Sequence, residues 1–508
     1  MAETAGNWLS ARVWLRPALA ALCFAVFALA VLALHQDKTV RFAVEEDGPI
    51  PAGLSHFLFG TPLGFTDAAL IPYFQKPSDK GSTAEVIEQV VRGDIAPTHD
   101  VRMPHDGVGI GPPLSATLAF ALFGLHARAL SLLFLALIGI SAISYIVRFR
   151  NERLWVEPVY LAALTFLLLA QVTERPGWAG AAPLGGERSY ILVAILPVLH
   201  WCFELVASRS CSRREALVRG LLLAVQVIIL GFAILVRYSP ICFIPAMLVS
   251  ALLGLRYGSA KRAAVVFLLP LAGLIIALYA VIPLAFRDQA DAGRLRSPIW
   301  HRAFMSYGVS PEWPFPGVIE RYACPQIPEG IKPHLVDRNG HCVWWADPMN
   351  QSRPAAEVEA GLYGVQYEAV LRRAFFDVLI RNPGKALATF LYYKPLRMLY
   401  WTGMSLIPWP APPSVAAAAA LQLVLIAGFL GLEPASGRGL KLGAGVTIAA
   451  AVVVSAFIPH LLAWSNPATG QELAAGVVCG AIISVWLGCR AVLRQLGQRM
   501  SSLGRVAR

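Results

Sequence analysis

Three consecutive carboxylates, Glu45, Glu46 and Asp47, form the densest acidic group in the first long polar stretch of the sequence. They lie about a dozen residues beyond the first apolar run. A carboxylate just outside a membrane can act as a general base towards an acceptor hydroxyl, or it can hold a divalent metal. A solvated acidic turn is the competing interpretation, because Gly48 and Pro49 follow directly.

Arg237 is the second feature that could do chemistry, since it lies between two long apolar runs with only residues 238–240 as a turn. A charged side chain at the edge of a membrane is costly and marks a functional site by default. The alternative is an arginine that extends its head to the lipid headgroups and has no other role.

Two His-Asp pairs, His99-Asp100 and His105-Asp106, are the best candidates for a metal site. Imidazole and carboxylate groups bind Mn or Zn. Their spacing matches no recognised ligand pattern. The sequence therefore establishes no cofactor. Whether His105 and Asp106 bind a divalent metal stays open.

Cys324 and Cys342 share one long polar segment, whereas the other six cysteines fall in apolar runs or in segments assigned to the inside. Two cysteines in an oxidising compartment that close a loop of under twenty residues predict a disulfide bond. Two unrelated free thiols are the alternative.

The elements that must position these residues are transmembrane helices. The chain has 508 residues, of which 56% are hydrophobic and only 15% charged, with a mean hydropathy of +0.58. A soluble domain carries about a quarter charged residues, so soluble, disordered and collagen-like classes are excluded. Apolar runs near the length needed to cross a bilayer predict an all-α polytopic membrane protein with ten spans, at residues 17–34, 129–147, 158–172, 190–207, 220–236, 238–255, 263–286, 412–432, 442–461 and 472–489.

The residues behind the net charge of +12 are distributed as the predicted topology requires. With the N-terminus inside, every loop assigned to the inside is basic, as the positive-inside rule requires. Both termini are then cytoplasmic. The partner expected for the basic loops is anionic membrane lipid, and no nucleic acid is needed to explain the charge. The first apolar run is too long for a signal peptide, so we expect it to be retained.

Two long segments, 35–128 and 287–411, break this alternation and fall outside. We expect each to fold into short helices on the outer face, with an interfacial or re-entrant helix over 113–124 and a headgroup-level helix over 385–401. The predicted domains are an N-terminal transmembrane module (1–286), an outer loop domain (287–411), and C-terminal helices with a basic tail (412–508).

Four stretches resemble the GT-C superfold of glycosyltransferases, which are integral membrane enzymes that use dolichyl- or polyprenyl-phosphate sugars. The order of a first span, a carboxylate pair and a long loop is similar to that family. HDGVGIGPPLSATLAFALFGLHARALSLLF (105–134) resembles its Pro-led short helix, with Arg128 entering the second span. LVRYSPICFIPAMLV (235–249) is similar to an Arg-containing outer turn, and SPIWHRAFMSYGV (297–309) with YGVQYEAVLRRAFFDVLIRNPGKAL (363–387) resembles the outer loop of bacterial members.

The resemblance implies an inverting hexosyl or pentosyl transferase with its active site on the periplasmic face of a bacterial inner membrane. Many members have Asp-Glu after the first span, whereas this chain has Glu46-Asp47 preceded by Glu45. The implied base is Asp47, then Glu46, with Glu45 as the weakest candidate. The donor is a polyprenyl-phosphate sugar, and the acceptor is a glycan, a lipid or a protein.

Such a donor needs cations at the headgroup plane to stabilise the departing phosphate. Arg237 is the first candidate, and Arg188 and Arg128 are further candidates with the same placement. His301 could donate a hydrogen bond to the phosphate or the acceptor, although a lone histidine is more often structural.

Two other classes compete with the transferase. A lipid-linked glycan polymerase or ligase would use outer arginines and histidines and would not need the acidic cluster. A transporter or flippase would carry ionisable residues inside its spans, and here the spans are nearly free of charge apart from Glu204.

Overall fold

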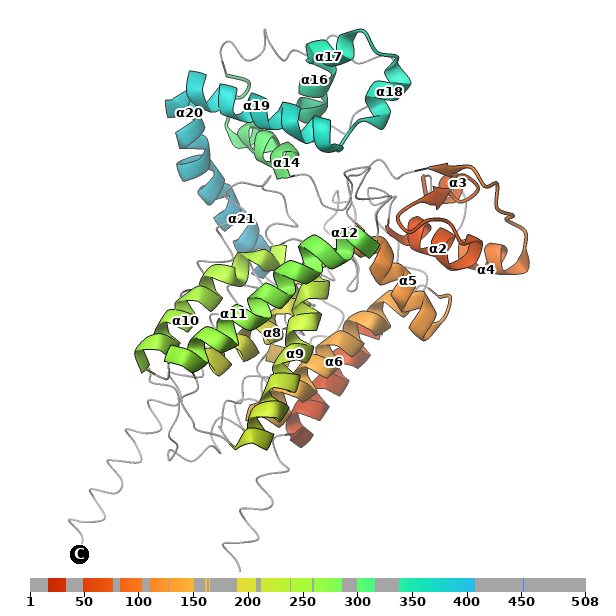
Figure 1. Ribbon diagram of the computed structural model, residues 1–508. Coiled ribbons are helices and arrows are strands. Elements are labelled where there is room, and N and C mark those ends of the chain that lie inside the picture. Colours follow the sequence, from red (N-terminus) through yellow and green to blue (C-terminus); the bar gives the residue numbers. More distant parts are fainter. Residues whose placement is uncertain are drawn as a thin grey trace, which may run out of the picture.

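The computed structural model describes most of the first four hundred residues of the chain. The described residues are 17–32, 49–75, 83–102, 110–126, 128–149, 160–161, 164, 190–206, 212–237, 239–257, 260–285, 299–315, 338–406 and 451. They are mostly helical (Figure 1). The sheet among them is one short antiparallel pair, β1 (Thr66–Asp67) with β2 (Val101–Arg102).

A bundle of apolar helices forms the largest part of this structure (Figure 1). Its members are the helix Pro17–Leu32, α6 (Ala129–Phe149), α8 (Tyr190–Val206), α9 (Arg213–Val236), α10 (Ile244–Tyr257), and α11 (Ala260–Ile276), which continues through the π-helical turn η3 (Ala277–Val281) into α12 (Ile282–Ala285). Within the described residues, three segments are long and apolar enough to cross a membrane: Ala129–Phe149, Arg213–Val236 and Ala264–Ala285. The predicted helical class is confirmed in coarse form, as a mostly helical structure with three candidate membrane spans, and the count of ten spans stays a prediction.

Helix α8 lies at the centre of the bundle because its apolar residues point in every direction. Its side chains pack with those of α6, α9 and α10 in one continuous core. Helix α11 is also apolar but lies at the edge of the bundle. Only 6% of the most apolar stretch of Ala264–Ala285 is buried. Apolar residues that face outward on a peripheral helix suit a hydrocarbon surrounding.

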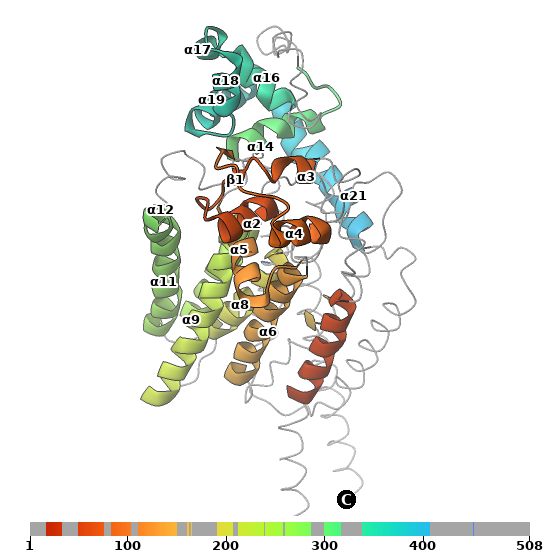
Figure 2. The same ribbon diagram turned by 90° about the vertical axis from the view of Figure 1, so that its right-hand side faces the viewer.

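The two ends of the bundle differ in what they carry. We call the end that contains Ala129, Tyr190 and Val236 the loop end, since the remaining helices gather there (Figures 1 and 2). The ring of Tyr190 at the start of α8 contacts Phe232 near the end of α9. We call the other end, where α6 and α8 finish and α9 begins, the far end.

The first loop unit comprises residues 49–123. It contains α2 (Pro49–Phe59), β1, α3 (Ile71–Gln75), α4 (Thr83–Arg92), β2 and α5 (Gly111–Phe123). Helix α2 lies directly on α5, because a Cβ on Gly53 would come within 2.6 Å of the Ala116 Cβ. Helix α5 covers the stretch expected to form a short apolar helix; its depth in a membrane stays a prediction.

A buried carboxylate organises this unit. Asp67 is fully buried and accepts hydrogen bonds from the backbone N–H groups of Ala69, Thr98 and His99 and from the Thr98 hydroxyl. Burial alone would raise the pKa of Asp67, but these hydrogen bonds outweigh it and hold the pKa below its usual value. Asp67 therefore ties the turn after β1 to the strand-like segment before β2.

The second loop unit comprises residues 299–406. Its elements are α14 (Ile299–Met305), η4 (Ser306–Val309), α16 (Arg338–Ala346), α17 (Pro348–Gln351), α18 (Ala355–Ala360), α19 (Val365–Arg381), α20 (Pro383–Ala388), the π-helix η5 (Thr389–Tyr393) and α21 (Lys394–Leu406). All buried residues of its core come from residues 303–386. The unit thus has a hydrophobic core of its own, built around Tyr307, which stacks between Trp313 and Phe375.

Candidate functional site

His301 lies on α14 and is held by two consecutive residues of α19. The Glu368 carboxylate accepts hydrogen bonds from the backbone N–H groups of Ile299, Trp300 and His301 at 2.8 to 3.0 Å. These are donors that a helix N-terminus leaves without intrahelical partners. The Nδ1 atom of His301 and the Tyr367 hydroxyl form a hydrogen bond of 2.6 Å. Helix α19 therefore determines both where α14 begins and how its imidazole ring is oriented.

A second histidine lies beside the first. The Nε2 atom of His341, on α16, and the Tyr363 hydroxyl form a hydrogen bond of 2.9 Å, and the ring centroids of His301 and His341 are 6.1 Å apart. We call His301, His341, Tyr363 and Tyr367 the His–Tyr cluster. An imidazole hydrogen-bonded to a phenol can hold or pass a proton near neutral pH.

Gly340 allows α16 to lie close to His301 and Tyr367. A Cβ at this position would lie 2.6 Å from the His301 Nδ1 and 2.9 Å from the Tyr367 hydroxyl oxygen. Such distances are shorter than side-chain carbons tolerate, so a residue without a Cβ is needed here. The glycine therefore lets α16 lie directly against the bonded His301–Tyr367 pair.

Cys342 follows His341 on α16 and is disulfide-bonded. Cys23, Cys202 and Cys242, the other cysteines within the described part of the chain, form no disulfide bond. Cys324 lies outside the described residues, so its pairing with Cys342 stays a prediction. The disulfide-bonded residue is next in sequence to His341 of the His–Tyr cluster.

Arg237 ends α9 at the loop end of the bundle. Its backbone is extended, its N–H donates to the Ala233 carbonyl, and its side chain is half-buried. The start of α5 packs against the α9 backbone directly before Arg237, since a Cβ on Gly111 would meet the Leu235 carbonyl oxygen at 2.0 Å. Arg128 precedes α6 at the same end and is also half-buried.

Two further cations lie on α21, close to the core of the second loop unit. The Lys394 ammonium is fully buried, donates to the Ser306 hydroxyl at 2.9 Å, and lies over the Phe390 ring at 5.2 Å. Burial lowers the pKa of Lys394 well below its usual value. Burial also lowers the pKa of Arg397, one turn further along the helix.

Several predicted site residues lie outside the described part of the chain. These are Glu45, Glu46, Asp47, Arg188, His105, Asp106 and Cys324. Among the residues that the structure does describe, no group of three or more His, Cys, Asp or Glu side chains could hold a metal ion. Of the predicted set, His301, Cys342, Arg128 and Arg237 are placed. His301 and Cys342 belong to the second loop unit, on α14 and α16, and the two arginines lie at the loop end, before α6 and after α9.

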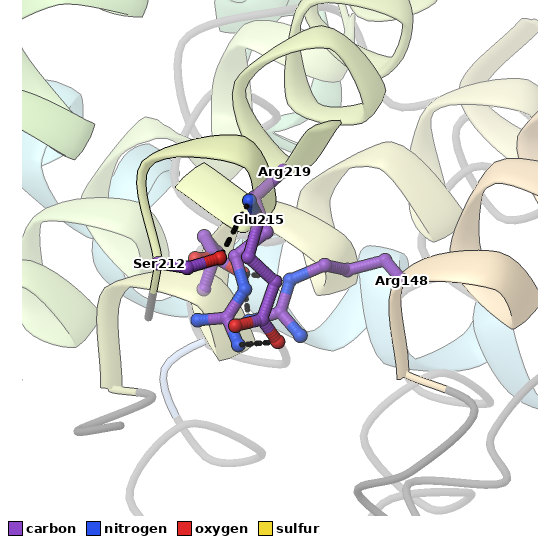
Figure 3. A network of polar contacts seen from close by, with 5 residues as sticks. Arg148, Ser212, Glu215 and Arg219 are labelled. Carbon is purple, nitrogen blue, oxygen red and sulfur yellow. Dashed lines mark hydrogen bonds and ion pairs between the residues drawn. The ribbon is translucent and has the colours of Figure 1, made fainter. Parts of the chain in front are cut away.

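The far end carries polar residues that the sequence did not single out as a group. The Arg148 guanidinium and the Glu204 carboxylate form an ion pair that is almost completely buried. Arg219 and Glu215 on α9 form a second pair at 3.4 Å, and Figure 3 shows Arg148, Glu215 and Arg219 gathered at this end. Glu204 was visible in the sequence as the one acid within a span, but its partner is 56 positions away.

His341, Tyr363 and Tyr367 were not predicted as site residues either. The one available signal was the position of His341 beside a cysteine expected to be disulfide-bonded. Comparison with known proteins adds no further guide: no family model, curated protein or solved structure matches the chain.

Proposed function

We propose that this protein is a membrane glycosyltransferase. It moves a hexosyl or pentosyl group from a polyprenyl-phosphate donor to a glycan, lipid or protein acceptor. The site is on the outer, periplasmic face of a bacterial inner membrane, and both chain termini are cytoplasmic. Asp47 is the general base, with Glu46 as the next candidate, and the transfer inverts the anomeric centre.

The observation that carries the proposal is the packing at the loop end. Helix α2 begins at Pro49, two residues after Asp47 in the chain. Helix α2 packs on α5 through Gly53, and α5 begins against the α9 backbone directly before Arg237. The elements that flank the predicted base and the predicted phosphate-binding arginine are therefore in contact through one short helix.

This arrangement suits the chemistry of the proposed transfer. The base takes the proton of the acceptor hydroxyl as that oxygen attacks the sugar carbon. The bond to the lipid phosphate breaks, and negative charge grows on the leaving phosphate. A cation held at a helix end stabilises that charge more in the transition state than in the ground state. In this proposal Arg237 has that role, and Arg128 and Arg188 assist it.

His301 is proposed to donate a hydrogen bond to the phosphate or the acceptor. Its Nδ1 already bonds the Tyr367 hydroxyl, so its orientation is set before any substrate binds. A ring that is oriented in advance loses less entropy when it contacts a reacting group.

The test is transfer of radiolabelled sugar from a polyprenyl-phosphate donor by the purified chain and three carboxylate variants. We expect Asp47→Asn to abolish transfer while the protein remains folded and inserted. Asp94→Asn is the matched control, because it makes the same chemical change at an exposed position of the first loop unit. Normal turnover in Asp47→Asn with an inactive Glu46→Gln would move the base by one residue. Activity in both would refute the carboxylate mechanism.

A second candidate function is a lipid-linked glycan polymerase or ligase. The specific observation in its favour is the His–Tyr cluster, which places two histidines in a folded unit with its own core. Such an enzyme would lose activity in His301→Gln and keep it in Asp47→Asn. The carboxylate and histidine variants, assayed side by side, separate the two functions.

The proposed topology has its own test. Reporter fusions at Ser82 and Pro328 are expected outside, and fusions at Arg213 and Arg494 inside. One clear reversal would break the ten-span arrangement and remove the periplasmic site with it.

A further inference from the structure

The start of α9 at the far end has the features of an anion site. Ser212 caps the helix, and its hydroxyl accepts a hydrogen bond from the Glu215 N–H. The helix is 24 residues long. Its first-turn N–H groups and its dipole favour a negative group at this end.

Arg219 is the independent observation that points to a ligand. Its side chain is only 9% exposed. One guanidinium nitrogen, Nη2, lies 3.4 Å from the Glu215 carboxylate, which turns the side chain back towards the first turn of its own helix. The other, Nη1, is buried and has no hydrogen-bond partner among the residues that the structure describes. A buried guanidinium donor without an acceptor is costly, so such a group calls for an anionic partner.

Further buried charges lie at the same end of the bundle. Arg148 and Arg219 are both buried, with side chains 2% and 9% exposed. Glu204 is buried with them at 5%, whereas Glu215 is 53% exposed and largely solvated. Figure 3 shows Arg148, Glu215 and Arg219 close together. An anion at the start of α9 would therefore lie near two buried arginines.

The surface around this point has two zones. Arg213 and Arg214, in the first turn, are exposed. Leu217 and Leu221, one and two turns further along α9, are 65% and 59% exposed. Cations followed along a helix by exposed leucines match a lipid, whose charged headgroup and acyl chain lie in that order.

We propose that the start of α9 binds the phosphate group of an anionic phospholipid, with Arg219 as its central ligand. The planar guanidinium can offer two donors to two phosphate oxygens, and the first-turn N–H groups can offer more. Leu217 and Leu221 then lie along the acyl chains. This site is at the opposite end of the bundle from the proposed sugar transfer and does not depend on it.

The experiment is native mass spectrometry of the full chain in a zwitterionic detergent, titrated with phosphatidylglycerol or phosphatidylcholine. We expect saturable binding of one phosphatidylglycerol, with a clear preference over phosphatidylcholine. Arg219→Gln should weaken that binding by about tenfold or more, the usual loss for a hydrogen bond to a charged group. Arg372→Gln removes the same charge from an exposed position on α19 in the second loop unit and should change it by less than about threefold.

Two further measurements keep the test sharp. Arg219→Lys keeps the charge but loses the planar fork, and an intermediate loss of lipid affinity is expected. It replaces Arg219→Gln if that variant is not monodisperse.

Excess inorganic phosphate distinguishes the source of the ligand. Phosphatidylglycerol binding that survives phosphate identifies a lipid site, whereas phosphate that stabilises the chain while the lipid does not bind refutes the lipid. Equal losses in Arg219→Gln and Arg372→Gln, or no lipid preference in the natural chain, also overturn the proposal.

Discussion

At the far end of the bundle, Arg148 and Glu204 join α6 to α8 through a buried ion pair, whereas at the other end His301 and Tyr367 share a hydrogen bond inside the second loop unit. Both contacts link residues more than fifty positions apart. The first neutralises two charges within an apolar bundle. The second orients an imidazole ring that can donate a hydrogen bond to a reacting group.

The difference between these two contacts predicts which substitutions should change stability and which should change activity. A buried ion pair contributes little in itself, but removal of one partner leaves the other charge buried and uncompensated. Substitutions at the far end should therefore change the free energy of unfolding. Substitutions at the loop end should change turnover, because the residues proposed to act in the transfer belong to that end. The following predictions test this division, from the largest expected effect to the smallest.

Arg237→Ala should reduce transfer by about two to three orders of magnitude, the usual cost of losing one preorganised donor to a developing charge. Arg237→Lys should be clearly impaired, since lysine keeps the charge but not the fork. The measurement is turnover with a polyprenyl-phosphate sugar. Arg213→Lys, at the exposed start of α9, is the control. Full activity in Arg237→Lys would mean that Arg237 only extends to the lipid headgroups.

Glu204→Gln should lower the free energy of unfolding by about 3 to 5 kcal/mol, because Arg148 would stay buried without its carboxylate. Thermal or denaturant unfolding in detergent measures this. Glu88→Gln breaks the exposed pair of Glu88 with Arg92 on α4 and should cost less than about 0.5 kcal/mol. Replacement of both buried partners, Arg148→Met with Glu204→Leu, should recover most of the loss. A large drop in turnover per folded molecule in Glu204→Gln would contradict the division.

Gly340→Ala should cost about 1 to 3 kcal/mol, since the new Cβ would push against His301 and Tyr367. It should also reduce turnover if the orientation of His301 matters to the reaction. Gly384→Ala is the matched control, because a Cβ there meets nothing within 4 Å and alanine favours the helix by up to about 1 kcal/mol. Equal effects of the two changes would show that the close approach at Gly340 is unimportant.

Lys394→Met should make the free energy of unfolding less dependent on pH. Burial lowers the pKa of Lys394 in the folded protein, so the unfolded chain binds more protons between that pKa and the usual value of about 10.4. The stability of the natural chain therefore rises with pH in this window, by at most about 1.4 kcal/mol per pH unit, and is lowest below it. Unfolding measured across alkaline pH should show this slope in the natural chain and in Lys385→Met, and lose it in Lys394→Met.

Local residue patterns predicted a good part of the elements. The short helix expected over 113–124 is α5, which has Pro112 and Pro113 in its first turn and Gly124 after its end with a φ of 91°. The helix expected over 385–401 is present as three consecutive pieces, α20, η5 and α21. Both follow from proline, glycine and apolar spacing, which act within one or two turns.

The candidate site was less predictable. His301 could be picked out, but its partners Tyr367 and Glu368 are 66 and 67 residues later. His341 reaches the same place only because Gly340 leaves room for it. No local pattern encodes such an approach, since it depends on how three helices pack around an aromatic core.

The sequence by itself indicated a helical chain with segments apolar enough to cross a membrane, because length, hydropathy and charge limit what each segment can bury. It also indicated which acids, arginines and histidines could act. Only the tertiary structure decided which of them meet: Arg148 with Glu204, His301 with Tyr367, and the start of α5 with the end of α9 beside Arg237. The physical reason is that burial follows from composition along the chain, whereas a hydrogen bond or an ion pair requires two groups within a few ångströms in space.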